Sequence, residues 1–286
     1  MNRRVPVVAA LLLWGLPLHA SAQNPTFSSK VEAVRVDVLV TKDGKPVRNL
    51  GPADFEIFDN GVPQQVDLVS FEQLPLNVVL TLDMSDSVVG ERLAHLRAAG
   101  QGLLDGLKSE DRAALVTFNH MVTLGADLTA DWGRVRRALD QARPKGNTSV
   151  VDAGFTGMML GESDVGRSLV IVFSDGLDTS SWLAPEAVIE IAKRSDVVVY
   201  AVSAGEGEKG GFLRELSEQT GGRLFEIEST KNLSAIFLQV LDEFRQRYVV
   251  SYSPAGVPAD GWHRLTVRVK GREVTVKARP GYLAGR

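Results

Sequence analysis

The sequence predicts an α/β fold with a doubly wound, mainly parallel sheet, together with a small β-sandwich module built from the two flanking segments. Between residues 75 and 247, strand and helix patterns alternate along the chain, and three of the strands are apolar throughout. Such strands are typical of parallel sheets covered by helices on both faces. Outside this region, apolar residues recur at every second position and no helical period appears, which predicts the β module.

The first 22 residues have the layout of a secretory signal peptide. Arg3 and Arg4 precede the apolar run 5–18, and Ala20-Ser21-Ala22 provides a small-residue cleavage site. A membrane anchor is the alternative, but the run is short for a span and is interrupted near its end. We therefore expect an exported protein, periplasmic or secreted, and no later segment is apolar enough to span a bilayer.

Residues 27–74 form the predicted N-terminal β segment. Valines at alternate positions in Val34–Val40 indicate a half-buried strand. A second strand is expected at Phe55–Phe58, and Asn60-Gly61 favours a tight hairpin because both residues tolerate positive φ. Gln65–Phe71 is then the returning strand. This segment is too short to close a good core alone.

Residues 75–247 form the predicted α/β domain, entered through a linker at 73–76. The strand at Arg112–Phe118 and its hairpin partner at Met121–Leu128 place one antiparallel strand at a sheet edge. The other expected strands are Asn77–Asp83, Ser168–Ser174, Asp196–Ser203 and Arg223–Ile227. The expected helices are Val89–Leu107, Asp131–Gln141, Ser149–Leu160, Pro185–Arg194, Phe212–Gln219 and Leu233–Arg247.

Residues 248–286 return to alternation, with strands expected at Tyr248–Tyr252, Trp262–Lys270 and Glu273–Arg279. Since neither flanking segment is self-sufficient, we expect 248–286 to pack with 27–74 and the α/β domain to be inserted between them.

Polar residues follow the apolar strands at points that a parallel sheet brings to one edge. Asp83, Ser85 and Ser87 end the first strand, Asp175 follows another, and Thr148 lies just before a helix. Two carboxylates and three hydroxyls suit a hard cation such as Mg²⁺, Mn²⁺ or Ca²⁺. The chain has no cysteine, which excludes thiolate zinc sites, disulfides and cysteine nucleophiles.

This pattern resembles the von Willebrand factor A domain. Asp-x-Ser-x-Ser after the first sheet strand, a Gly-x-Thr loop and a Ser-Asp-Gly after an apolar strand match its metal-ion-dependent adhesion site, in order and spacing, over roughly residues 76–247. The resemblance implies that Asp83, Ser85, Ser87, Thr148 and Asp175 bind the metal. The flanks look like those of exported bacterial proteins with such a domain.

The resemblance implies metal-dependent binding of a protein ligand, or adhesion, with an acidic side chain of the ligand completing the metal site and without catalysis. Two alternatives stay open. In the first, the protein is a structural subunit of an envelope assembly and the metal only stabilises its fold. In the second, the site supports magnesium-dependent phosphoester hydrolysis. The formal net charge of −3 argues against non-specific binding to nucleic acid.

Other signals are weaker. Gly205–Gly210 reads as a dinucleotide-binding fingerprint, but two glutamates would face the pyrophosphate and the motif follows a late strand. Ser85 or Ser87 could act as a nucleophile only with a general base nearby. We expect no histidine there, because His120 is expected in a hairpin turn at the opposite end of its strand. Asp86 is interpreted as a solvated loop residue, or as a carboxylate that tunes the charge of the site or contacts a ligand. The basic residues between Arg134 and Lys145 are interpreted as a solvated helix face, or as an electropositive approach for an acidic ligand.

Overall fold

The computed structural model describes residues 33–71, 74–162, 165–175, 177–204 and 211–285. The predicted signal peptide lies outside the described residues, as does the glycine-rich stretch 205–210. Among the described helices, none is long and apolar enough to cross a membrane.

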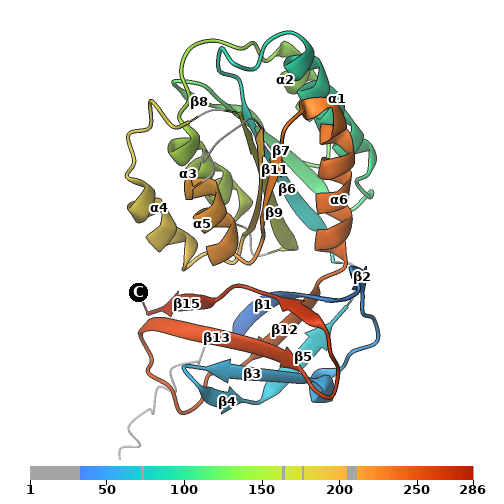
Figure 1. The fold of residues 1–286 in the computed structure, drawn as a ribbon, viewed down its shortest axis with the longest axis vertical. Coiled ribbons are helices and arrows are strands. Elements are labelled where there is room, and N and C mark those ends of the chain that lie inside the picture. The colour runs from blue at the N-terminus through green and yellow to red at the C-terminus, as the bar shows by residue number, and fades with distance from the viewer. Residues whose placement is uncertain (1–32, 72–73, 163–164, 176, 205–210, 286) are drawn as a thin grey trace, which may run out of the picture. The chain divides into compact units, whose positions relative to one another are not determined.

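A six-stranded sheet with the order β11-β10-β9-β6-β7-β8 forms the centre of the α/β domain (Figure 1). All neighbouring strands are parallel except β7 and β8, so the predicted mainly parallel sheet with one antiparallel edge strand is confirmed. The strands are β6 (Leu76–Asp83), β7 (Arg112–Phe118), β8 (Val122–Thr129), β9 (Arg167–Ser174), β10 (Val198–Ala204) and β11 (Leu224–Ile227).

Helices cover both faces of this sheet, which explains why β6 is apolar along its length and buried at all eight positions. Val78, Leu80 and Leu82 face one helix layer, and Val79 faces the other. The first layer consists of α1 (Glu91–Asp105), α2 (Trp132–Gln141) and α6 (Leu233–Arg245). The second consists of α3 (Val150–Gly161), α4 (Pro185–Ala192) and α5 (Gly211–Gln219).

Helix α3 approaches β6 closely, because Gly157 has no side chain at the contact. A Cβ at this position would lie 2.5 Å from the Thr81 hydroxyl oxygen. The glycine therefore fixes the depth at which α3 packs on the sheet and, with it, the position of the loop that precedes the helix.

The flanking segments build a β-sandwich together, as the sequence predicts. One sheet has the order β14-β1-β12-β5, with β2 beside β1, and the other has the order β15-β13-β3-β4 (Figure 1). Both sheets mix strands from the two ends of the chain, and their inner faces share one apolar core. The strands are β1 (Val34–Lys42), β2 (Lys45–Pro46), β3 (Phe55–Asp59), β4 (Val62–Gln64), β5 (Val66–Ser70), β12 (Tyr248–Tyr252), β13 (Gly261–Val269), β14 (Thr275–Lys277) and β15 (Gly281–Ala284).

The strand returning from the Asn60-Gly61 hairpin differs from the expectation, since it divides between the two sheets. Both turn residues have positive φ, as the sequence predicts, and β4 pairs with β3. The chain then changes sheet, and β5 pairs with β12. Gln64 holds this corner, because its amide donates to the Ala255 carbonyl (3.0 Å) and accepts from the Ala255 amide (2.8 Å).

A polar cluster lies in the core of the sandwich around Asp59, whose side chain is fully buried. Its carboxylate bonds His263 Nδ1 at 2.7 Å and accepts the hydroxyls of Tyr252 and Tyr282, each at 2.9 Å. Burial raises the pKa of both tyrosines, so both stay protonated and donate to Asp59. The cluster joins β3, β12, β13 and β15 and satisfies a buried carboxylate that would otherwise be costly.

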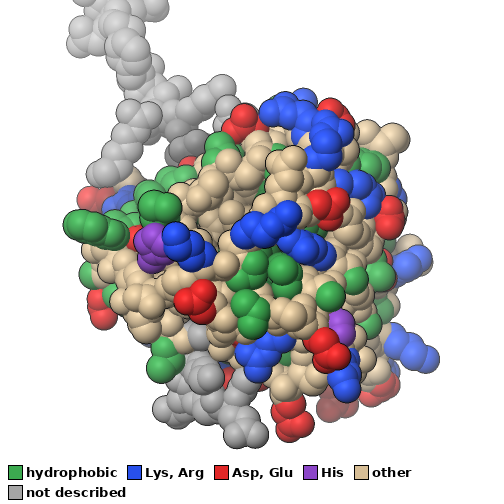
Figure 2. Space-filling view, turned by 90° about the horizontal axis from the view of Figure 1, so that it is seen from above, with side chains coloured by type: hydrophobic (Ala, Val, Ile, Leu, Met, Phe, Trp, Pro, Cys, Tyr) green, Lys and Arg blue, Asp and Glu red, His purple; other side chains and the backbone are tan. Residues whose placement is uncertain are grey.

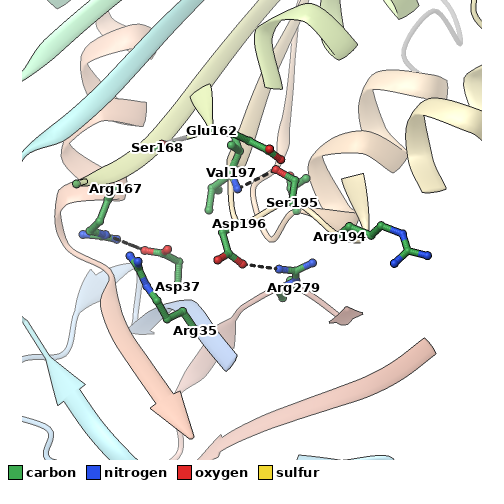
Figure 3. Close-up of a pocket in the computed structure, with 13 residues that line it drawn as sticks. Arg35, Asp37, Glu162, Arg167, Ser168, Arg194, Ser195, Asp196, Val197 and Arg279 are labelled. Carbon is green, nitrogen blue, oxygen red and sulfur yellow. Dashed lines mark hydrogen bonds and ion pairs between the residues drawn. The ribbon is translucent and has the colours of Figure 1, made fainter. Parts of the chain in front are cut away.

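Ion pairs line a cavity of about 220 Å³ between the amino-terminal ends of β9 and β10 and the β-sandwich (Figure 3). Arg167, at the start of β9, bonds Asp37 of β1, and Arg279 bonds Asp196 at 3.3 Å. Because these pairs join the two modules, they bear on the stability of the whole described structure.

Candidate metal centre

Strand register brings Asp83 and Asp175, two of the predicted ligands, to the carboxyl edge of the sheet. Asp83 is the last residue of β6 and pairs with Phe118 of β7, while Leu82 pairs with Phe173 of β9, which places Ser174 and Asp175 beside Asp83. In open α/β sheets this edge is the usual position of a ligand site.

Main-chain hydrogen bonds hold the loop after β6 against the loop before α3. Lys145 donates to the Met84 carbonyl at 2.8 Å, and Asp86 donates to the Gly146 carbonyl at 2.9 Å. On its other side, the Thr148 carbonyl accepts the amides of Thr179 and Ser180 at 2.8 and 3.0 Å. The three loops therefore form one connected unit around the end of β6.

Four of the five predicted ligands are joined in a chain of hydrogen bonds. The Ser85 amide donates to Asp83 Oδ1 at 2.8 Å, and the hydroxyls of Ser85 and Ser87 lie 3.0 Å apart. The Ser87 hydroxyl in turn donates to Asp175 Oδ1. Thr148 is also buried and is held through its main chain, whereas no described hydrogen bond joins its hydroxyl to the other four ligands.

Two further residues complete the site. The Ser174 hydroxyl donates to Asp83 Oδ2 at 2.7 Å, and Arg92 Nη1 donates to Asp175 Oδ2 at 2.8 Å. The Ser-Asp-Gly motif contains Ser174 but assigns it no role, and Arg92 lies outside the motifs. Ser174 could have been found from strand register, because it ends a strand adjacent to β6. Arg92 follows the motif by five residues, and only the turn into α1 brings it back to the site.

Burial raises the pKa of the Asp83 carboxyl to about 6, because desolvation disfavours its charged form. Hydrogen bonds from Ser85 and Ser174 oppose this effect, and the charge of Asp175 adds to it. A positive charge placed near Asp83 would therefore stabilise the ionised form of its carboxyl group.

This pKa predicts a pH dependence of stability in chelator-treated protein. Between about pH 4 and pH 6 the folded state keeps the Asp83 proton that the unfolded state releases, so the free energy of unfolding falls as pH rises through this window. The fall is at most about 3 kcal/mol, at about 1.4 kcal/mol per pH unit. Urea titrations from pH 4 to pH 7 measure it. An identical pH profile in the Asp83→Asn variant would contradict this assignment.

The donor set fits a hard divalent cation. The carboxylates of Asp83 and Asp175 provide charge, the hydroxyls of Ser85, Ser87 and Thr148 are neutral oxygen donors, and such donors suit Mg²⁺, Mn²⁺ and Ca²⁺. No group of three or more His, Cys, Asp or Glu side chains suited to a metal occurs in the described part of the chain. A cation here would therefore depend on hydroxyl ligands. Ser87 is exposed, so the site is open to solvent on that side.

The hairpin turn with His120 lies at the carboxyl edge of the sheet, and not at the opposite edge as expected from the sequence. Because β7 runs parallel to β6, the hairpin after Phe118 lies at the carboxyl edge, and a Cβ on Gly146 would come within 2.6 Å of His120 Nδ1. The expectation that the opposite end of the strand carries this turn is wrong. Within the described residues, the hydroxyls of Ser85 and Ser87 bond each other and Asp175, and neither bonds His120.

The sheet and the oxygen cluster at its edge define a Rossmann-like domain with a binding site at the carboxyl ends of its strands. The model of the von Willebrand factor type A domain family matches residues 77–239, and the chain belongs to this family. Domains of this family carry a divalent cation at a metal-ion-dependent adhesion site and commonly mediate adhesion between proteins.

Known proteins resemble this chain at low sequence identity. Inter-alpha-trypsin inhibitor heavy chain H2 of Mus musculus is 24% identical over 245 residues, which is 79% of this chain and 26% of that protein. Mussel byssus proximal thread matrix protein 1, solved with a zinc-occupied site, has a TM-score of 0.55 at 18% identity over 65% of this chain and 49% of that one. A von Willebrand factor type A protein from Catenulispora acidiphila has a TM-score of 0.53 at 14% identity over 86% and 74%. The chain spans about a quarter of the length of the curated relative.

Proposed function

We propose that this protein is an exported, metal-dependent protein-binding or adhesion module. Asp83, Ser85, Ser87, Thr148 and Asp175 hold a divalent cation, Mg²⁺ or one of its relatives Mn²⁺ and Ca²⁺. An acidic side chain of a protein partner completes the coordination. The observation that carries the proposal is the hydrogen-bonded chain from Asp83 to Asp175 at the carboxyl edge of the sheet.

The surface around the site supports a protein partner. Val89, Leu177 and Trp182 are exposed at 56%, 56% and 93%, each on a loop that follows a strand of the central sheet. The Trp182 loop is fixed, because the Asp152 carboxylate accepts the amides of Trp182 and Leu183 at 3.0 and 2.9 Å. An exposed tryptophan on a fixed loop loses little entropy on binding and is typical of interface hot spots. Figure 2, seen from above the domain as drawn in Figure 1, shows Lys and Arg side chains beside hydrophobic ones on this face.

Binding, rather than catalysis, fits the polar groups present. The exposed serine of the described site, Ser87, donates its hydroxyl to Asp175, and Arg92 pairs with the second oxygen of this carboxylate. Both oxygens of the carboxylate next to this hydroxyl are therefore already engaged by donors of the protein itself. We therefore propose no phosphoester hydrolysis, and turnover of a generic phosphoester that Asp83→Asn abolishes would overturn this part of the proposal.

The test is calorimetric titration of Mg²⁺ and Mn²⁺ into chelator-treated protein. Wild type is expected to bind one ion, and Thr148→Val is expected to bind it roughly tenfold more weakly because one oxygen donor is lost. Thr156→Val is the matched control, since the Thr156 hydroxyl bonds the Asp152 carbonyl inside α3. Equal binding by Thr148→Val and wild type would remove Thr148 from the ligand set, and no binding by wild type would overturn the proposed function.

A further inference from the structure

We infer that Arg92 sets both the metal affinity and the ligand preference of the site. It competes with the cation for Asp175, and once the cation holds Asp175, it binds the carboxylate that the partner offers. This inference rests on the proposed function and names a residue that the metal-binding motif does not contain.

The competition follows from the geometry at Asp175. This carboxylate is almost fully buried, with a side chain 1% exposed, and both of its oxygens are engaged. Oδ1 accepts the Ser87 hydroxyl, and Oδ2 accepts Arg92 Nη1 at 2.8 Å. A cation bound by Asp175 and Ser87 would be attracted by the same negative charge that the guanidinium now neutralises. Two positive groups next to one carboxylate repel each other, so each weakens the binding of the other.

The second role follows from the donors that Arg92 has left. The side chain is 52% exposed, at the first turn of α1, and its described hydrogen bonds all come from Nη1, to the Ser87 carbonyl and to Asp175. A guanidinium has five N–H donors in a planar fork that matches a carboxylate. Nε and Nη2 are therefore available to an acidic side chain that approaches the open side of the site, where Ser87 is exposed.

These two roles predict effects of opposite sign in Arg92→Gln. The variant is expected to bind Mn²⁺ roughly tenfold more tightly, because a repelling charge is removed from beside the site. In the Mn²⁺-saturated protein, acetate is expected to bind roughly fivefold more weakly, because a charged donor to the carboxylate is lost. Glutamine is polar and has a helix propensity similar to that of arginine, as an exposed position of α1 requires, so we expect the variant to fold.

Mn²⁺ affinity is measured from the electron paramagnetic resonance signal of the free ion, and acetate affinity from the water-proton relaxation of bound Mn²⁺. Arg112→Gln is the matched control, because it removes the same charge from an exposed position at the opposite end of the sheet. It is expected to leave both affinities within about twofold of wild type, since a solvent-exposed charge this far from the site is screened.

The outcomes separate the inference from the proposed function. Unchanged Mn²⁺ affinity in Arg92→Gln, with binding by wild type intact, overturns the competition while the metal site stands. Tighter Mn²⁺ binding with unchanged acetate affinity overturns the role in ligand recognition. Similar changes in Arg112→Gln show a general charge effect and overturn both roles. Absence of Mn²⁺ binding in wild type overturns the proposed function itself, and the inference with it.

Discussion

Asp83→Asn is expected to weaken metal binding by roughly a hundredfold or more and yet to leave the chelator-treated protein at least as stable as wild type at pH 7. The side chain is fully buried at the end of β6, and burial raises its pKa to about 6. At neutral pH the folded protein therefore carries a desolvated negative charge, which costs up to about 3 kcal/mol. Asparagine has the same shape without the charge, so the folded state is relieved of this cost.

The hydrogen bonds around Asp83 suit this substitution. Its Oδ1 accepts from the Ser85 amide and its Oδ2 accepts from the Ser174 hydroxyl. In the variant, the amide oxygen still accepts from Ser85, and the Ser174 hydroxyl rotates to accept from the new NH₂ group. The loss of a negative charge next to a divalent cation is expected to lower metal affinity by roughly a hundredfold or more.

Two measurements check this prediction: urea unfolding of both proteins in chelator, and the same titration with excess Mg²⁺. Wild type is expected to gain stability from the ion by mass action, whereas the variant gains none. Asp105→Asn is a suitable control, because this exposed carboxylate pairs with Arg136 on the surface of α1. A variant that loses several kcal/mol in chelator would show that folding needs the charge of Asp83, and the prediction would then be wrong.

The α/β domain was predictable because its apolar patterns allow one stable arrangement. Three wholly apolar strands separated by helices must form a parallel sheet with both faces covered, and the structure has β6, β9 and β10 side by side at its centre. The alternating flanks also required a common core, and β1 pairs with β12 while β3 pairs with β13.

Side-chain partners were predictable only where strand register determines them. Asp83 ends β6 and Asp175 follows the neighbouring strand β9, so their proximity could be inferred from sequence. Arg92 reaches Asp175 through a loop and the first turn of a helix, and the direction of such a turn cannot be read from local pattern. The position of His120 likewise depends on the direction of a strand. Its hairpin has a clear local signal, but the edge that holds the turn is decided by the parallel direction of β7 relative to β6.

The corner at Gln64 shows what could not be predicted from the sequence of the β module. The alternation of 62–71 is compatible with one return strand or with two short strands in different sheets. The change of sheet depends on Ala255, which lies 191 residues further along the chain. The same holds for Asp59, whose partners Tyr252, His263 and Tyr282 come from the other end of the chain. Long-range polar contacts of this kind leave no periodic signal.

Arg167→Met is expected to destabilise the protein by about 3–5 kcal/mol, which is the usual cost of removing one member of a buried ion pair. The Arg167 side chain is 1% exposed and Asp37 is 15% exposed. The guanidinium bonds Asp37 Oδ1 through Nε at 2.9 Å, donates to the Phe244 carbonyl at 3.3 Å, and lies 4.6 Å from the centre of the Phe244 ring. Methionine keeps much of the contact with the ring but leaves Asp37 without its charge partner.

The double variant Asp37→Leu with Arg167→Met separates the charge from the packing. Replacing both members of a buried pair by apolar residues is often close to neutral, so we expect the double variant to recover most of the stability that Arg167→Met loses. Urea unfolding followed by circular dichroism measures both, with Arg112→Met as the control at an exposed position of the same sheet edge. A loss below about 1 kcal/mol in Arg167→Met would place the pair among weak surface contacts. Since Asp37 belongs to β1 and Arg167 to β9, a large loss that the double variant restores would show that this pair couples the stability of the β-sandwich to that of the α/β domain.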